Sequence, residues 1–223
     1  MPTHDWLRVD VDLFHDFHQT WIVELSGSLN SRLPDGYSAL LERRSWRRLP
    51  DMSKPVADFD SQPMTPTSRR NRIGILHALR RIACVVEIVS PGNKEGRAAR
   101  ESFAENVVGF LKAGIHVVVV DLFPTGPSFH DLVWNHFGTG VSERHPIGPM
   151  LVASYKAERP NEDETTEAFL EPLAIGAAIP EMPAFLESDF YVNLPLEDTY
   201  MRAWSSCPKD MRYLVEHGKL PDE

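Results

Sequence analysis

A carboxylate inside an apolar run has the clearest chemical consequence of any residue in this chain. Glu87 lies within the run Val-Val-Glu-Ile-Val at positions 85–89, and such a run predicts a central strand covered on both faces. Burying an ionised carboxylate without a partner costs several kcal/mol. Glu87 is therefore expected either to bind a cation or to form a salt bridge with a nearby arginine, and the sequence leaves both open.

Two further residues would complete a catalytic set with Glu87. Asp51 forms a Pro-Asp step after a strand-like segment, and Lys94 lies in a glycine-containing loop, 90–96, that leads into a helix. Two carboxylates and a lysine suit metal-assisted phosphodiester hydrolysis, in which Mg²⁺ or Mn²⁺ activates water and the ammonium neutralises the phosphate. The predicted catalytic residues are therefore Asp51, Glu87 and Lys94. The predicted metal ligands are Asp51, Glu87 and Glu42.

The charge of the chain is unevenly distributed. The net charge is −9, yet residues 43–100 contain eleven arginines and two lysines against five acidic residues. A local excess of positive charge can bind phosphate whatever the total charge. This segment is a candidate nucleic-acid-binding surface, and the alternative is that its arginines pair with acids elsewhere. The residues predicted to contact nucleic acid are Arg43, Arg44, Trp46, Arg47, Arg48, Arg69, Arg70 and Asn93, with Trp46 placed to stack on a base.

The elements that would position these residues follow from hydrophobic periodicity. Apolar residues at helical spacing predict an amphipathic helix over 12–31 with Asp12 as its N-cap. The order strand, helix, strand over 82–123 predicts a right-handed parallel crossover. Residues 52–70, with three prolines, are expected to form a loop. Strands are expected over 37–44, 72–79, 82–90, 115–123 and 150–156, and helices over 97–113, 129–137 and 197–206.

Composition predicts one soluble α/β domain over residues 1–223. Hydrophobic residues make up 42% of the chain, which is enough for a real core. The 18 prolines indicate a wrapping C-terminal part from about residue 158, with short extended segments and a last turn to His217. The absence of a signal sequence or membrane span predicts a cytoplasmic location. Two cysteines exclude a disulfide framework, and a homodimer is left open.

Histidines offer a second route to a metal. His15 and His18 are three residues apart on the first predicted helix, a spacing that can bring two imidazoles together. His18 falls inside the apolar arc of that helix and His15 at its flank. A packed, hydrogen-bonded pair is therefore the favoured interpretation.

Several longer motifs extend across nearly the whole chain. They are His-Asp-Trp at 4–6 with Arg-Val-Asp at 8–10, Phe-His-Asp-Phe-His at 14–18, Val-Glu-Ile-Val-Ser-Pro-Gly-Asn-Lys at 86–94, Asp-Leu-Phe-Pro at 121–124, Glu-Pro at 171–172, Pro-Leu-Glu at 195–197, Thr-Tyr at 199–200 and Ala-Trp at 203–204. With these motifs the chain resembles a bacterial domain-of-unknown-function family. That family is similar to the Uma-type endonucleases and hence to the PD-(D/E)XK restriction-endonuclease-like superfamily.

The resemblance implies a restriction-endonuclease-like fold, a mixed central sheet flanked by helices, with Asp51 and Glu87 on the metal. The chain departs from the superfamily pattern in two places. Val89 occupies the position where the lysine normally follows the acid, so that Lys94 would be a migrated replacement. The helix after it contains no lysine before Lys112.

Three classes of function therefore stay open at this point. The first is a Mg²⁺- or Mn²⁺-dependent nuclease that acts through Asp51, Glu87 and Lys94. The second is a non-catalytic module that binds nucleic acid through the basic segment 43–100 on the same fold, which the valine at position 89 favours. The third is an interaction or scaffold protein in which the acidic surface and the proline-rich C-terminal third carry the function, and in which Glu87 pairs with an arginine.

Overall fold

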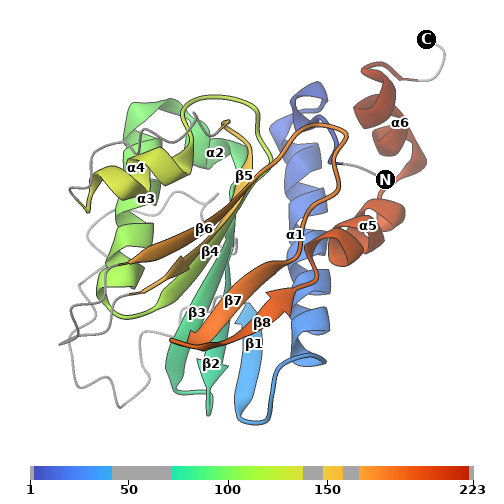
Figure 1. The fold of residues 1–223 in the computed structure, drawn as a ribbon. Coiled ribbons are helices and arrows are strands. Elements are labelled where there is room, and N and C mark those ends of the chain that lie inside the picture. Colours follow the sequence, from blue (N-terminus) through green and yellow to red (C-terminus); the bar gives the residue numbers. More distant parts are fainter. Residues whose placement is uncertain (1–2, 42–71, 138–147, 158–165, 221–223) are drawn as a thin grey trace.

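The computed structural model describes residues 3–41, 72–137, 148–157 and 166–220 (Figure 1). Its helical elements are η1 (Trp6–Arg8), α1 (Val11–Asn30), α2 (Pro91–Lys94), α3 (Gly96–Lys112), α4 (Phe129–Asn135), α5 (Leu196–Ser206) and α6 (Lys209–His217). Its strands are β1 (Tyr37–Leu41), β2 (Arg72–His77), β3 (Arg81–Ile88), β4 (His116–Asp121), β5 (Leu151–Lys156), β6 (Glu167–Pro172), β7 (Met182–Glu187) and β8 (Phe190–Leu194).

Six strands form one mixed sheet in the order β1-β2-β3-β4-β5-β6. The first three strands are antiparallel neighbours, β3 and β4 are parallel, and β4, β5 and β6 are again antiparallel neighbours. The parallel pair is joined through α2 and α3, which confirms the crossover predicted over 82–123. The predicted mixed sheet flanked by helices is therefore present.

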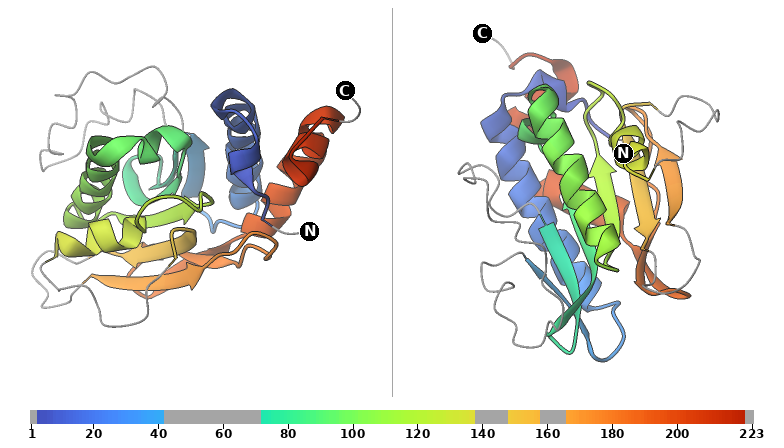
Figure 2. Two further views of the ribbon diagram at one scale, coloured as in Figure 1. Left: turned by 90° about the horizontal axis from the view of Figure 1, so that it is seen from above. Right: turned by 90° about the vertical axis from the view of Figure 1, so that its left-hand side faces the viewer.

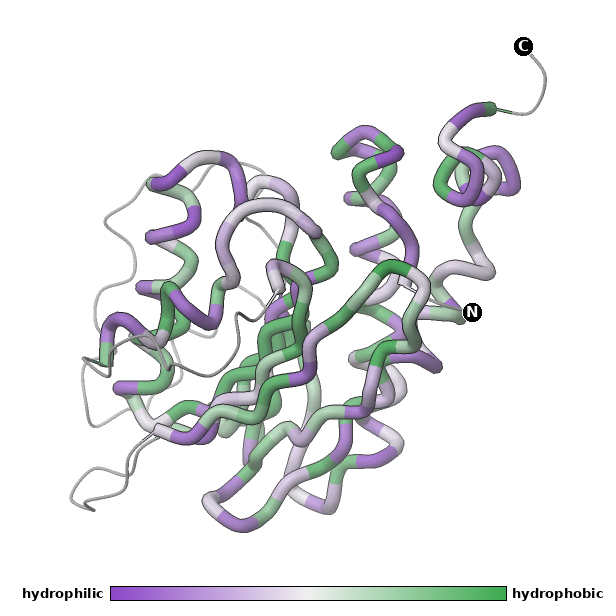
Figure 3. The backbone as a smooth tube through the Cα atoms, turned by 45° about the horizontal axis from the view of Figure 1, so that its top comes forward, coloured by the Kyte–Doolittle hydropathy of each residue, from purple (hydrophilic) through white to green (hydrophobic). Residues whose placement is uncertain are grey.

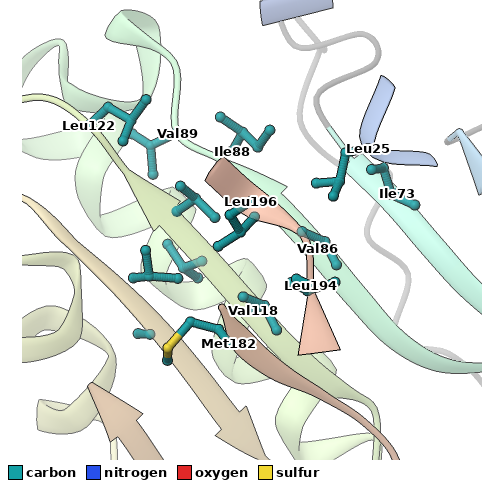
Figure 4. Close-up of a cluster of buried hydrophobic side chains, with 14 of the residues drawn as sticks. Leu25, Ile73, Val86, Ile88, Val89, Val118, Leu122, Met182, Leu194 and Leu196 are labelled. Carbon is teal, nitrogen blue, oxygen red and sulfur yellow. The ribbon is translucent and has the colours of Figure 1, made fainter. Parts of the chain in front are cut away.

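The two faces of the sheet are covered by different elements (Figure 2). Val86 and Val118 belong to a buried cluster with side chains from α1, the β7–β8 hairpin and the start of α5 (Figure 4). Glu87 points to the opposite face because side chains alternate along a strand, and this face packs against α3. Hydrophobic residues are concentrated in the central strands, and hydrophilic ones are frequent in the helices (Figure 3).

Helix α1 begins one residue before the predicted start and is capped by a different residue. The Asp10 side chain accepts a hydrogen bond from the Leu13 amide at 2.9 Å, so the prediction of Asp12 as N-cap was wrong. Asp12 instead lies in the first turn, where the positive end of the helix dipole stabilises a carboxylate. Both aspartates suit a helix start, which is why the sequence did not separate them.

The N-terminal His-Asp-Trp motif attaches the start of the chain to α5. The Tyr200 hydroxyl accepts hydrogen bonds from the His4 amide at 3.2 Å and from Trp6 Nε1 at 3.1 Å. The same hydroxyl lies 2.7 Å from His4 Nδ1, and the His4 ring stacks on Trp204 with centroids 3.7 Å apart. Residues from both ends of the chain therefore form one buried aromatic cluster.

The C-terminal part is partly as predicted. Residues beyond 158 that the structure describes supply three extended strands, and α5 starts one residue before its predicted range. Residues 209–217 form the full helix α6 where only a turn was expected. Met211 and Val215, four residues apart, bury one stripe of this helix, and Pro208 precedes its first residue without breaking it. No helix in the described ranges is long and apolar enough to cross a membrane.

His18 is fully buried between α1 and the sheet. Its Nε2 donates to the Ile88 carbonyl at 3.1 Å, in agreement with the packed role predicted for it. His15 is exposed, so the prediction of a packed pair was wrong for that residue. Burial lowers the pKa of His18 from 6.5 to about 4, because the cost of burying the charged imidazole outweighs the opposing effect of the hydrogen bond to Ile88. The folded protein therefore keeps this imidazole neutral under mildly acidic conditions.

The protonation of His18 predicts acid lability with a defined sign. Between about pH 6.5 and pH 4 the unfolded chain binds a proton that the folded chain does not, so the free energy of unfolding falls as the pH falls. We expect His18→Gln, which retains a hydrogen-bond donor, to remove up to about 3 kcal/mol of this pH dependence. Urea unfolding of both proteins at several pH values measures the difference, and parallel profiles would contradict the prediction.

Candidate site of buried ion pairs

Glu87 is buried on β3 and forms an ion pair across the sheet. Arg72 is its cross-strand neighbour on β2, and Arg72 Nε lies 2.5 Å from Glu87 Oε1. The carboxylate side chain is 4% exposed and the arginine side chain 24%. The Arg72 guanidinium also lies over the Phe110 ring of α3, 5.4 Å from its centroid. Of the two partners left open by the sequence, an arginine is present.

Lys94 forms the second buried ion pair, with Asp121 at the end of β4. Its Nζ lies 2.7 Å from Asp121 Oδ2, and the lysine side chain is 5% exposed. The same Nζ donates to the carbonyl oxygens of Phe123 at 2.6 Å, Thr125 at 2.9 Å and Pro149 at 3.4 Å. An ammonium carries three protons, and these four oxygens engage all of them. Lys94 therefore has no proton left to offer a phosphate in this arrangement.

The short helix α2 holds Lys94 in this position. Asn93 Oδ1 accepts hydrogen bonds from the Ser90 amide and the Ser90 hydroxyl, each at 2.8 Å. Arg100 Nη1 donates to the Lys94 carbonyl at 3.2 Å. Through its contacts Lys94 connects the segment after β3 with the loop after β4 and the chain just before β5. This is the pattern of a residue that fixes loops relative to one another.

Burial shifts the pKa of both partners in this pair. The pKa of Asp121 rises to about 7 through burial, against the opposing effects of Lys94 and of the Phe123 amide, which donates to Oδ1 at 3.0 Å. Burial likewise lowers the pKa of Lys94, although Asp121 opposes the shift. Both shifts reflect the cost of burying two charges, which the mutual attraction of Asp121 and Lys94 offsets only in part.

Most of the other predicted site residues lie outside the described residues. They are Glu42, Arg43, Arg44, Trp46, Arg47, Arg48, Asp51, Arg69 and Arg70. Of the three predicted metal ligands only Glu87 is described, and no group of three His, Cys, Asp or Glu that could hold a metal occurs within the described ranges. Asn93 is described, and its side-chain oxygen serves the local turn.

The described part of the basic segment does not form one surface. Arg72 and Lys94 form ion pairs with the buried carboxylates of Glu87 and Asp121, and Arg97 pairs with Glu101 at 2.7 Å. Arg80 and Arg81 are exposed at the start of β3, whereas Arg97 follows its far end, roughly 23 Å away for a strand of this length. The candidate phosphate-binding segment is therefore shorter than 43–100, and the prediction now depends on the arginines of residues 43–70.

Asp121 and Arg72 are the members of these ion pairs that sequence reasoning did not single out. Asp121 ends the run His-Val-Val-Val-Val-Asp at 116–121, a context as apolar as that of Glu87. The same burial argument would have marked it as a carboxylate in need of a partner. Arg72 could not be singled out, because choosing it among eleven nearby arginines requires the β2–β3 register.

Comparison of the chain with protein-family models, curated proteins and solved structures finds no match. The site is therefore interpreted from its own geometry. It consists of two buried ion pairs near the ends of neighbouring parallel strands, Glu87 with Arg72 and Lys94 with Asp121. Each of the two predicted catalytic residues that the structure describes has a protein partner of opposite charge.

Removing the charge of Glu87 tests how strongly the Arg72 pair stabilises the fold. We expect Glu87→Gln to lower the free energy of unfolding by about 2–4 kcal/mol, because breaking one half of a buried pair leaves the other charge uncompensated. Chemical denaturation at pH 7 measures this loss, with the exposed Glu105→Gln as control. An unchanged midpoint for Glu87→Gln would show that the pair contributes nothing to stability.

Proposed function

We propose that this protein is a nucleic-acid-binding module on a restriction-endonuclease-like fold, and that it binds without cleaving. The observation that carries the proposal is the engagement of Lys94, whose protons are directed at Asp121 and three backbone carbonyls. The pairing of Glu87 with Arg72 and the valine at position 89 support it further. The mixed sheet with helices on both faces fits the proposed fold.

The binding charge in this proposal comes from the arginine-rich residues 43–70. Arg72, which forms the ion pair with Glu87, is the first residue of β2 and follows this segment closely in the sequence. Phosphate binding by arginines releases counterions, which makes affinity fall steeply with salt. The aromatic ring of Trp46 adds a sequence-tolerant stacking partner for a base.

Fluorescence anisotropy with labelled DNA and RNA oligonucleotides, single- and double-stranded, tests the proposal. Affinity should fall by about 1,000-fold between 50 and 200 mM salt if about six phosphates are contacted. A dye-labelled uncharged polymer serves as control. Affinity that does not respond to salt, or no binding to any oligonucleotide at low salt, would contradict the proposal.

The second candidate is a Mg²⁺- or Mn²⁺-dependent nuclease. The observation that favours it is Glu87 itself, a buried carboxylate on a central strand whose arginine partner reaches solvent. In this proposal Glu87 and Asp51 would hold the ion, with Glu42 as a further ligand, and the ion would supply the activated water. Lys94 would have to leave Asp121 to act, which costs it four oxygen contacts.

A further inference from the structure

Strand β6 carries an unusual row of exposed side chains. It is the last strand in the order of the six-stranded sheet, with β5 as its neighbour. Ala168 and Leu170 pack against the core, whereas Glu167, Phe169 and Glu171 share the other face and are exposed. The edge strand therefore presents a carboxylate, an aromatic ring and a second carboxylate in line.

The Phe169 ring belongs to an aromatic cluster that reaches the protein surface. Phe169 and Tyr191 are 43% and 51% exposed, and both contact Phe185, with ring centroids 5.4 and 5.6 Å from it. Strand β7 packs across β3, β4 and β5, so it covers this face as far as the neighbour of β6. We call Phe169, Phe185 and Tyr191 the β6 aromatic surface, in which Phe185 is buried and Phe169 and Tyr191 reach solvent over it. Exposed apolar side chains grouped in this way mark interaction sites.

Acidic side chains surround this surface. Glu167 and Asp189 have side chains 55% and 95% exposed, and both lie near Lys156, at 3.6 and 4.0 Å. Glu171 and Glu187 are also exposed. Arg81 is a further cation, because its charge and that of Glu187 both act on Tyr37. Carboxylates outnumber cations here, which repels a phosphate backbone and attracts a cationic peptide.

We propose that the edge of β6 binds an extended segment of another protein, which adds a strand to the sheet. Strand addition supplies affinity through main-chain hydrogen bonds and specificity through alternate side chains. Cross-strand neighbours share a face, so Glu167 and Glu171 select lysine or arginine and Phe169 selects an aromatic or apolar residue between them. The partner motif is thus cation-x-aromatic-x-cation. This inference is independent of nucleic-acid binding.

A synthetic peptide of seven residues in the order threonine, lysine, valine, tryptophan, valine, lysine, threonine serves as the probe. Fluorescein-labelled, it should bind at least about tenfold more tightly than the same peptide with glutamates for lysines. N-methylation of alternate backbone amides should abolish binding, because it blocks strand pairing. Hydrogen–deuterium exchange should slow in residues 167–172 when the unmodified peptide is added. Equal binding of all three peptides would overturn the proposal.

Matched variants separate this surface from general attraction to an acidic protein. Phe169→Ser should weaken binding of the lysine peptide about tenfold. Val23→Ser, at another exposed apolar residue, should leave that binding unchanged. Glu167→Gln with Glu171→Gln should weaken it by a similar factor, and the equally charged control Glu105→Gln with Glu216→Gln should leave it unchanged. The same loss in the control variants would overturn the proposal.

The same set of proteins tests two other occupants of this surface, a second copy of the chain and a nucleic acid. Residues 44–48 of this chain, which lie outside the described residues, read Arg-Ser-Trp-Arg-Arg and have the motif themselves. Concentration-dependent dimerisation that Phe169→Ser abolishes would assign the surface to a second copy and overturn the proposal. Displacement of the peptide by a DNA oligonucleotide in wild type, but not in the Phe169→Ser background, would do the same in favour of nucleic acid.

Discussion

Asp121→Asn is expected to lower the free energy of unfolding by about 3–5 kcal/mol at pH 7.5, because it leaves the Lys94 ammonium buried without its counter-charge. Asparagine keeps the shape of the side chain and an oxygen that can accept the hydrogen bond from the Phe123 amide. The loss of unfolding free energy therefore reports on the missing charge and not on packing. The three carbonyls around Lys94 Nζ carry partial charges and cannot replace a carboxylate. Guanidinium unfolding of both proteins measures the difference.

A double variant gives this prediction its internal control. Lys94→Met leaves the Asp121 carboxyl, which can take up a proton because its pKa is already raised to about 7, so its cost should be smaller than that of Asp121→Asn. Lys94→Met with Asp121→Leu removes both charges and should cost less than the sum of the single variants. The exposed Arg97→Gln should show no measurable change. Additive losses would mean that Lys94 and Asp121 are not coupled.

Replacement of four arginines is expected to have the largest effect on binding. Arg43, Arg44, Arg47 and Arg48 changed together to glutamine should reduce nucleic-acid affinity by about 100-fold or more at low salt, because each arginine that contacts a phosphate releases a counterion. The slope of log affinity against log salt should become shallower by about 3.6 for duplex DNA if all four arginines contact phosphates, at about 0.9 per lost contact. Anisotropy titrations at four salt concentrations give both quantities.

The control for this variant is a pair of arginines from the described part of the same basic segment. Arg80→Gln with Arg81→Gln changes two exposed arginines at the start of β3. If residues 43–70 carry the binding, this pair should change affinity no more than a few-fold. An affinity loss as large as that of the four-arginine variant would place the nucleic-acid surface at the β2–β3 turn instead.

Much of the fold follows from the sequence because its central elements have strong local signals. The apolar runs around Val86 and Val118 predict buried strands, and the helical spacing between them predicts α3. Their parallel pairing follows from the intervening helix. The helix α6 was missed because its burial depends on packing of Met211 and Val215 against distant parts of the chain, which no local pattern contains.

The candidate site was harder to predict because pairing is a property of register. The sequence marked Glu87 as a buried carboxylate that needed a cation, and the structure supplies Arg72. It also marked Lys94, but as a residue facing a phosphate. The turn at α2 instead directs this side chain toward Asp121, 27 residues further along the chain. Loop geometry of this kind depends on carbonyls such as those of Phe123 and Thr125, which carry no sequence signature.

The most direct test of this interpretation is a cleavage assay with Mg²⁺ or Mn²⁺ on a mixed panel of DNA and RNA substrates. Wild type, Glu87→Gln and Lys94→Met are compared, each shown to be folded by circular dichroism. We expect salt-sensitive binding by all three proteins and cleavage by none, since the charges of Glu87 and Lys94 are satisfied within the protein. Metal-dependent cleavage by wild type that disappears in Glu87→Gln would contradict the proposal and establish a nuclease.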